Sequence, residues 1–236
     1  FRLSQPFTFG QAAQAASPEK RWQGNLFANY EQTARSFLAL NPYRPAEFTR
    51  DWNTDASRDT VAEQIARAGF NLENKKWLLS RYEFGAFRRQ GVYDGLRNFG
   101  SVLLKKRGWE LAAEGNFLRT EGRLERTQFD RPKIDLSRTF FRNDSLSKKA
   151  VLKTGIYAER EKNARTSVGA DTLNGLSFWY DLYRLYFQIP ENQGAWQFAG
   201  FASQRNDFAP SGAFFRRNTL ANELNLNGAW NNLRRK

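Results

Sequence analysis

The stretch Trp109-Glu110-Leu111-Ala112-Ala113-Glu114-Gly115-Asn116-Phe117 decides the fold class of this chain. Its odd positions carry apolar side chains or glycine, while both glutamates and the asparagine fall on even positions. A period of two places these sets on opposite faces of an extended strand, because successive side chains of a strand point to opposite sides. The stretch therefore predicts a long β-strand with one apolar face and one wet face.

The same alternation returns around residues 22–34 and 220–230. From Lys75 onward it is interrupted by clusters of Gly, Asn, Asp and Ser, which are typical of turns. Connections this short join antiparallel neighbours, because parallel pairing requires a longer crossover. Many segments exceed the about 5–6 residues usual in globular strands. The predicted strands cover about residues 77–88, 96–107, 109–125, 128–140, 149–161, 173–189, 195–206 and 217–231.

These patterns predict an all-β chain: an antiparallel meander of long strands, either a barrel or an extended sheet, with an irregular N-terminal quarter. We expect about 8–10 strands. We divide the chain into a lead-in segment (1–21), a region with a strand, a loop rich in proline and aromatic residues and a mixed segment (22–74), and the meander (75–236). The absence of Met and the basic end after a strand-like segment predict a piece of a larger chain, although removal of a signal peptide also explains a missing first Met.

The mixed region leaves one choice open. Residues 58–68 fit a helix with Val61, Ile65 and Ala68 on one face, but the alternation of Ala62, Ala66, Ala68 and Phe70 also allows a strand. The loop at 41–53 is expected to be ordered, because its two prolines lower the entropy lost on ordering and because Trp52 offers a large apolar area for packing.

A change of phase occurs within the segment 109–125. Apolar residues are odd through Phe117 and even from Leu118 onward, where the odd positions carry alternating Arg and Glu. A β-bulge near Phe117-Leu118 would account for the change. Beyond it, the alternating charges indicate a strand that runs out of an apolar layer into water.

The residue types exclude several kinds of site. The chain has no Cys and no His, so disulfides, thiolate sites and imidazole bases are absent. No apolar run approaches the roughly 20 residues of a membrane helix, so any membrane crossing must use strands. Lys and Arg number 37 against 24 Asp and Glu, a net charge of +13. This excess indicates a solvated basic surface or an anionic partner such as nucleic acid, lipid headgroups or an acidic polysaccharide.

No catalytic arrangement accompanies the strands. Glu110 with Glu114, and Glu121 with Glu125, are each four residues apart on a strand, roughly 13 Å, which exceeds the usual spacing of paired catalytic carboxylates. The glycine-rich segments lack the residues of a phosphate loop, and the aspartates near residue 55 lack the pattern of a calcium loop. We therefore predict no catalytic residue, no metal site and no cofactor, and a protein that is not an enzyme.

Basic and aromatic residues alternate near several predicted strand ends. Such clusters fit packing without a ligand, aromatic girdles at a membrane interface, or stacking platforms for single-stranded nucleic acid. The candidate anion-binding residues are Arg81, Arg88, Arg89, Arg184, Arg216 and Arg217. The candidate interface aromatics are Tyr82, Phe84, Phe87, Tyr183, Tyr186, Phe187, Phe214 and Phe215.

The pattern over about residues 75–232 resembles that of gram-negative outer-membrane β-barrels and barrel-associated envelope proteins. The shared features are long alternating strands, aromatic strand ends, and polar residues on the second face. The resemblance implies an outer-membrane or envelope location, with membrane lipid or other envelope proteins as partners. Two features depart from it: strands such as 119–126 and 157–165 are too polar to face lipid throughout, and Lys236, not an aromatic residue, is last.

Two functions from different classes follow. The first is a non-catalytic structural or transport component of the bacterial outer envelope, part of a larger chain or assembly. The alternative is a basic β-sheet module that binds an anionic polymer such as nucleic acid or acidic polysaccharide, with nucleic acid the less favoured partner. Affinity for nucleic acid would fall steeply with salt, which separates the two.

Overall fold

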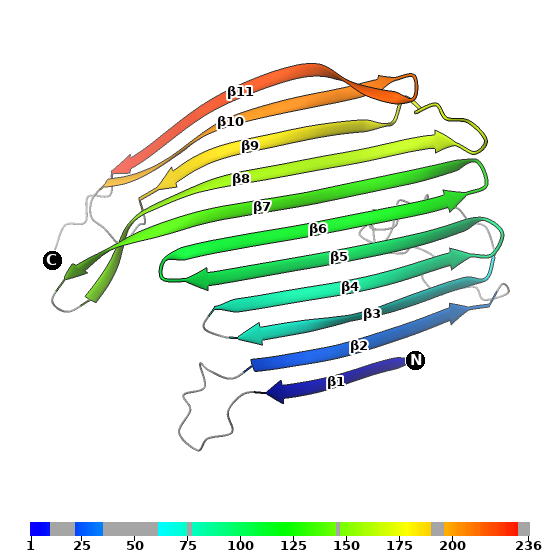
Figure 1. The fold of residues 1–236 in the computed structure, drawn as a ribbon, viewed down its shortest axis with the longest axis horizontal. Coiled ribbons are helices and arrows are strands. Elements are labelled where there is room, and N and C mark those ends of the chain that lie inside the picture. The colour runs from blue at the N-terminus through cyan, green and yellow to red at the C-terminus, as the bar shows by residue number, and fades with distance from the viewer. Residues whose placement is uncertain (10–21, 35–60, 75–76, 145–146, 190–195, 231–236) are drawn as a thin grey trace.

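The computed structural model describes residues 1–9, 22–34, 61–74, 77–144, 147–189 and 196–230. The described residues form one antiparallel sheet whose strands follow one another in chain order (Figure 1). β1 and β11 are its two edges, and they do not pair with each other, so the sheet is not closed. The strands are β1 (Arg2–Phe9), β2 (Trp22–Thr33), β3 (Glu63–Asn74), β4 (Leu78–Arg89), β5 (Tyr93–Lys106), β6 (Trp109–Gly122), β7 (Glu125–Asp144), β8 (Ser147–Ser167), β9 (Phe178–Gln188), β10 (Trp196–Ser211) and β11 (Phe214–Trp230).

The predicted all-β antiparallel meander of long strands is confirmed. The sheet has eleven strands in the described residues, more than the expected number, because β1 and β3 belong to it as well. β1 lies in what the sequence indicated as a lead-in segment. Its alternation is weak because Gln5 interrupts the apolar positions and Pro6 falls inside the strand. Pro6 is compatible with β1 because an edge strand needs hydrogen-bond donors on one side only.

β3 decides the choice that the sequence left open at residues 58–68. Residues from Glu63 onward form a strand that pairs with β2 on one side and β4 on the other. Ala66 and Ala68 therefore share a sheet face, and Ile65 lies on the other face. The loop at 41–53, with Trp52, lies outside the described residues.

The strand registers place every described side chain on one of two faces, because directly paired residues of antiparallel strands point to the same side. One face, here the apolar face, carries Leu104, Leu111 and Leu136, which pair across β5, β6 and β7. The other, here the polar face, carries Glu114 and Lys133, which pair across β6 and β7.

The sheet also has two ends, which we name by a residue at each. The turns from β4 to β5, β6 to β7, β8 to β9 and β10 to β11 lie at the Phe215 end. β3 ends and β4 begins at the Arg107 end, where the turn from β5 to β6 also lies. Figure 1 shows the Phe215 end at the right and the Arg107 end at the left.

The bulge predicted at Phe117-Leu118 is wrong. β6 keeps one register with β5 and with β7 through this point. The phase changes because each face changes its character along the strand: the apolar face becomes charged from Arg119 onward, while Leu118 is buried on the polar face. The described register shifts occur elsewhere, between Phe140 and Phe141 and between Asp207 and Phe208.

The buried apolar cluster is small. Ile65, Phe87 and Leu118 meet on the polar face, with Tyr93 and Phe129 packed against them. Burial raises the pKa of the Tyr93 phenol above its ordinary value. No second layer of secondary structure covers either face within the described ranges. The sheet therefore leaves most of its large apolar side chains uncovered.

Candidate functional site

The uncovered apolar side chains form a continuous band on the apolar face. At its centre the row Leu104, Leu111 and Leu136 lies beside a second row of Val102, Ala113 and Ile134. The band extends over all eleven strands. Its exposed members include Leu3, Leu26, Tyr30, Phe70, Tyr82, Phe84, Leu96, Phe117, Ile134, Leu136, Ile156, Tyr183, Leu185, Phe198, Leu220, Leu224 and Leu226. Monomeric soluble proteins rarely expose an apolar patch of more than a few hundred Å², so this band indicates a surface that is covered in the functional state.

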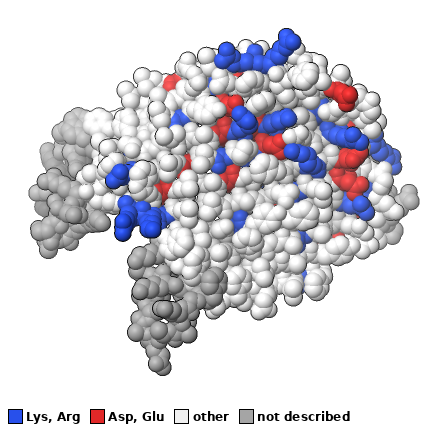
Figure 2. All heavy atoms as spheres, in the orientation of Figure 1, with Lys and Arg blue, Asp and Glu red and all other residues white. Residues whose placement is uncertain are grey.

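Beyond the band, toward the Phe215 end, the apolar face carries ion pairs. The Nε of Arg88 lies 2.6 Å from Asp94, and Arg119 and Arg160 contact Asp130 and Asp181 at the same distance. Arg126 contacts Glu121 at 2.8 Å. The hydrogen bond to Asp94 raises the pKa of the Arg88 guanidinium above its ordinary value. In Figure 2, acidic and basic side chains lie together toward this end.

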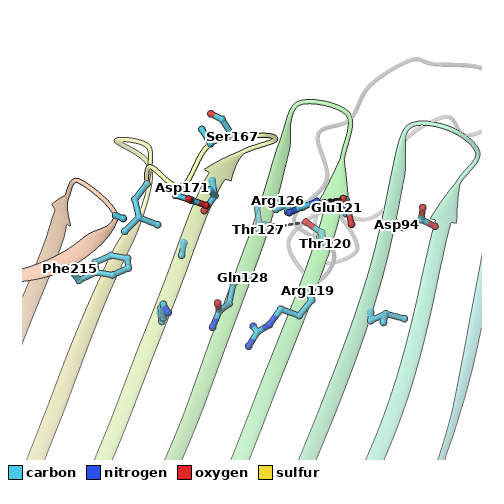
Figure 3. A pocket seen from close by; sticks show the side chains of 17 residues that line it. Asp94, Arg119, Thr120, Glu121, Arg126, Thr127, Gln128, Ser167, Asp171 and Phe215 are labelled. Atoms are coloured by element: carbon cyan, nitrogen blue, oxygen red, sulfur yellow. Dashed lines mark hydrogen bonds and ion pairs between the residues drawn. The ribbon is translucent and has the colours of Figure 1, made fainter.

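A hollow of about 590 Å³ lies among these charged residues (Figure 3). Arg119, Glu121 and Arg126 line it from β6 and β7. Asp171 contributes from the connection between β8 and β9, and Phe215 from the start of β11. Its charged walls are mostly neutralised by the ion pairs just described. The hollow is therefore a depression with little net charge.

The aromatic side of the hollow is a packed cluster. The ring of Trp179 stacks on Phe208 with centroids 4.7 Å apart and meets the edge of Phe215 at 6.0 Å. The ammonium of Lys162 lies 5.8 Å from the centre of the Phe215 ring. These rings link β9, β10 and β11 at the point where the apolar face becomes charged.

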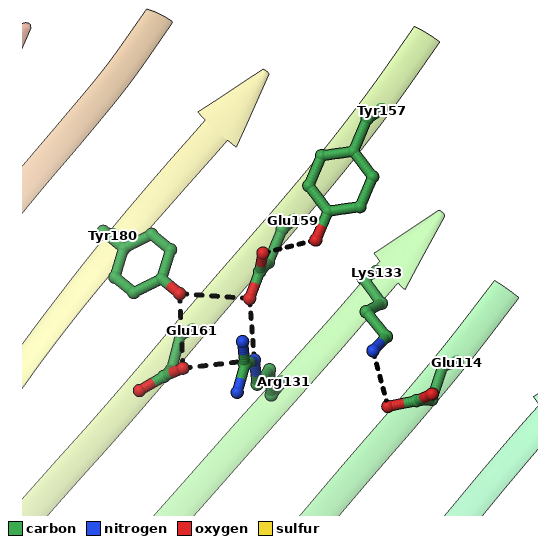
Figure 4. A network of polar contacts seen from close by, with 7 residues as sticks. All are labelled: Glu114, Arg131, Lys133, Tyr157, Glu159, Glu161 and Tyr180. Atoms are coloured by element: carbon green, nitrogen blue, oxygen red, sulfur yellow. Dashed lines mark hydrogen bonds and ion pairs between the residues drawn. The ribbon is translucent and has the colours of Figure 1, made fainter. Parts of the chain in front are cut away.

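The polar face is held by a hydrogen-bonded network around Glu159 (Figure 4). The Nε of Arg131 donates to Glu159 at 2.7 Å, and the hydroxyls of Tyr157 and Tyr180 donate to the same carboxylate at 2.5 and 3.0 Å. Arg131 also contacts Glu161 at 3.2 Å. Only 8% of Glu159 is exposed, so these partners supply the hydrogen bonds that water would otherwise make.

Shorter chains of polar contacts continue across this face. Lys133 lies 2.8 Å from Glu114. The carboxylate of Glu110 lies between Lys105 and Lys153, at 3.1 and 3.4 Å. Of the carboxylates that the sequence offered as acid–base pairs, Glu110 and Glu114 are thus each bound to lysine and do not face one another as a pair. Glu121 and Glu125 instead contact Arg126 and Arg165.

The candidate anion-binding arginines do not gather at one place. Arg81, Arg88 and Arg89 each contact a carboxylate, in Glu83, Asp94 and Glu63 respectively. Arg184 lies on the polar face, with its guanidinium carbon 4.4 Å from the centre of the Phe201 ring. Arg216 and Arg217 are exposed beside the turn between β10 and β11.

The candidate interface aromatics divide between the faces. Those on the apolar face are Tyr82, Phe84, Tyr183, Phe187 and Phe215. Tyr186 lies on the polar face and donates to Asp135 at 2.7 Å. Phe87 is 2% exposed in the buried cluster, and Phe214 is 75% exposed beside its turn.

Sequence reasoning missed Arg131, Tyr157, Glu159 and Tyr180. The sequence shows the charged residues at 157–165, but it suggested only that this strand is too polar to face lipid throughout. The alternation of these residues along β8 was the signal that could have placed them on one face. Finding their partners required the registers of β7 with β8 and of β8 with β9.

Within the described residues, no group of acidic residues could hold a metal ion. No helix in this part of the chain is long and apolar enough to cross a membrane. Comparison with known proteins finds no family model, no curated protein and no solved structure that matches this chain.

Proposed function

We propose that this chain forms part of the wall of a β-barrel in the outer membrane of a gram-negative bacterium, as a non-catalytic structural or transport component. Its apolar face contacts lipid and its polar face lines the interior. In this proposal β1 and β11 pair with further strands, because a sheet in lipid tolerates no free edge. Membrane lipid and other envelope proteins are the partners, and no cofactor is required.

The observation that carries this proposal is the continuous apolar band on one face of a single sheet. A membrane-crossing strand needs about 9–11 residues, and ten of the eleven strands reach at least that length. Alternation of outward apolar with inward polar side chains is the pattern of such walls. The charged Phe215 end of the apolar face then lies beyond the hydrocarbon, which explains why β6 is apolar only up to Phe117.

The polar face supports the same arrangement. A network such as that around Glu159 holds its charges in hydrogen bonds on a surface that water reaches. An interior of this kind has little need of a packed core, in agreement with the small cluster at Ile65, Phe87 and Leu118.

Two neighbouring residues of β10 provide the test. Ala202 lies on the apolar face opposite Leu224, and Ser203 lies on the polar face opposite Glu223. Because the chain has no Cys, Ala202→Cys and Ser203→Cys each create a single thiol for a fluorescent label. In lipid vesicles, a quencher on the acyl chains should quench the label at 202 and spare the label at 203. A water-soluble quencher should give the reverse order.

Equal quenching at both positions would overturn the proposal. So would a monodisperse, folded monomer that forms without any lipid or detergent, because its apolar band would then be stable in water.

The alternative, a basic sheet that binds an anionic polymer, has weaker support. Arg216 and Arg217 are exposed, but the remaining candidate arginines lie apart and half of the six contact carboxylates. A single-stranded oligonucleotide should bind at low ionic strength with an affinity that falls steeply with salt if this alternative holds. Absence of binding at low salt removes it.

A further inference from the structure

Two adjacent lysines of β5 have opposite surroundings. Lys105 lies on the polar face, where its ammonium contacts Glu110 at 3.1 Å. Lys106 lies on the apolar face, where it pairs in register with Trp109. Among the described residues Lys106 has no ion pair. The chain therefore places an uncompensated cation at the border of its apolar band.

Arg138 is a second cation at the same border of the apolar band. It pairs in register with Trp109 from the other side, so Lys106, Trp109 and Arg138 form one row across β5, β6 and β7. Its guanidinium carbon lies 5.0 Å from the centre of the Trp109 indole and 4.9 Å from that of Phe140. Arg138 is exposed and, within the described part of the chain, contacts no carboxylate.

Arg107 adds a third cation at the turn between β5 and β6. Figure 2 shows the resulting group of basic side chains at the left, beside this turn. The Phe215 end differs, because there Arg88, Arg119 and Arg160 each contact an aspartate. The two borders of the apolar band thus differ in charge: one is largely neutralised and the other is positive.

The residues next to the positive row are apolar. Moving away from the Arg107 end, Lys106, Trp109 and Arg138 are followed by the row Leu104, Leu111 and Leu136. A row that holds two cations and an aromatic ring is thus followed by a row of aliphatic side chains, in the same order as the headgroup and the acyl chains of a phospholipid.

We propose that Lys106, Arg107, Trp109, Arg138 and Phe140, here the Arg138 patch, bind the phosphate-bearing headgroup of an anionic phospholipid. The acyl chains lie over the leucine row. This inference rests on the proposed membrane function and adds a lipid preference to it. Basic residues near an anionic lipid surface are attracted to it, and the flanking rings keep the Arg138 guanidinium close to the sheet.

A label beside the patch measures the preference. Leu136→Cys carries the only thiol of that variant and lies two residues from Arg138 on the same face. The labelled chain is reconstituted in phosphatidylcholine vesicles with a small fraction of spin-labelled lipid, either phosphatidylglycerol or phosphatidylcholine. We expect the phosphatidylglycerol probe to quench about two- to fivefold more strongly, and the ratio to fall with salt.

The variant pair for this test comes from the two lysines. Adding Lys106→Gln and Arg138→Gln should bring the ratio close to one, while Lys105→Gln on the polar face should leave it unchanged. Lys106→Gln alone should give an intermediate quenching ratio. This single substitution tests the lipid preference if the double substitution prevents folding.

The failures are distinguishable. Equal quenching by the two probes in the starting protein, or a ratio that survives both substitutions, overturns the lipid preference and leaves the membrane function standing. No quenching by either probe shows that the apolar face does not meet lipid, and overturns both.

Discussion

Leu118 is buried by residues that are far from it in sequence. Its 2% exposed side chain meets Ile65 from β3 and Phe87 from β4. We expect Leu118→Ala to lower the free energy of unfolding by about 2–5 kcal/mol, because it removes apolar contacts and leaves a cavity. A denaturant titration of the folded chain in detergent micelles measures this. Leu124→Ala, at an 84% exposed turn position, is the control and should change it little.

Tyr93 should make stability depend on alkaline pH. Burial raises the pKa of its phenol in the folded chain, while in the unfolded chain the pKa stays near the ordinary value of about 10. Its contribution is therefore complete below about pH 10 and is lost as the pH rises toward the raised pKa. Tyr93→Phe should flatten the fall in unfolding free energy above that pH. Identical slopes in the two proteins would contradict this.

Single residues also show what the sequence alone could not predict. Arg88 and Arg89 are adjacent and were grouped as anion-binding candidates, yet they point to opposite faces and contact Asp94 and Glu63. The residue type and the clustering of these arginines predicted an anion-binding site. The carboxylate that neutralises each arginine depends on how neighbouring strands pair, and the sequence does not show that register.

At the scale of one element, the turn between β5 and β6 depends on two unusual residues. Arg107 and Gly108 have φ values of 51° and 86°, as the short turns of twisted hairpins require. A Cβ on Gly108 would lie 2.6 Å from the carbonyl oxygen of Thr139, on the neighbouring strand β7. The turn is therefore fitted closely against β7.

Gly108→Ala should consequently lower the free energy of unfolding by more than the strain of its positive φ alone. That strain is about 1–2 kcal/mol, and the clash with Thr139 adds to it. Gly169→Ala is the matched control, because Gly169 has a φ of 82° but no atom within 4 Å of the added Cβ. Unfolding titrations should give a lower free energy of unfolding for Gly108→Ala than for Gly169→Ala. Equal losses would show that β7 yields to the added methyl group.

Strands were predictable where alternation was long and uninterrupted, as in β6 and β11. Their ends were less so: β5 begins at Tyr93 and β7 extends to Asp144, beyond the expected limits. β1 was missed because an edge strand tolerates Gln5 and Pro6. The change of phase in β6 was visible, but a bulge and a change of environment produce the same pattern, and only the pairing with β5 and β7 separates them.

At the scale of the whole molecule, function depends on the alignment of faces across all strands. Alternation within one strand shows two faces, but a shift of one residue between neighbours would place Ile134 among the charges of the polar face. The short turns set the registers that join the apolar positions into one band. The positive border at Arg138 and the network at Glu159 follow from the same alignment, which is why neither was predicted from the sequence.

The proposed lipid contact predicts that one substitution has opposite effects in two media. Ile134 is 46% exposed in the middle of the apolar band. In a bilayer, Ile134→Lys should lower the free energy of unfolding by about 2–4 kcal/mol, because lysine near the midplane loses its hydration. In water without lipid, the same change should reduce aggregation, because it interrupts an exposed apolar patch.

Ser101→Lys is the control for this pair of measurements. Ser101 lies on the polar face in register with Glu114, so the added ammonium stays in water beside a carboxylate. Denaturant titrations in vesicles should show a large loss for Ile134→Lys and a small change for Ser101→Lys. A loss of similar size for both would mean that the two faces meet the same medium. Since a barrel wall separates lipid from water, such a result is incompatible with the function proposed for this sheet.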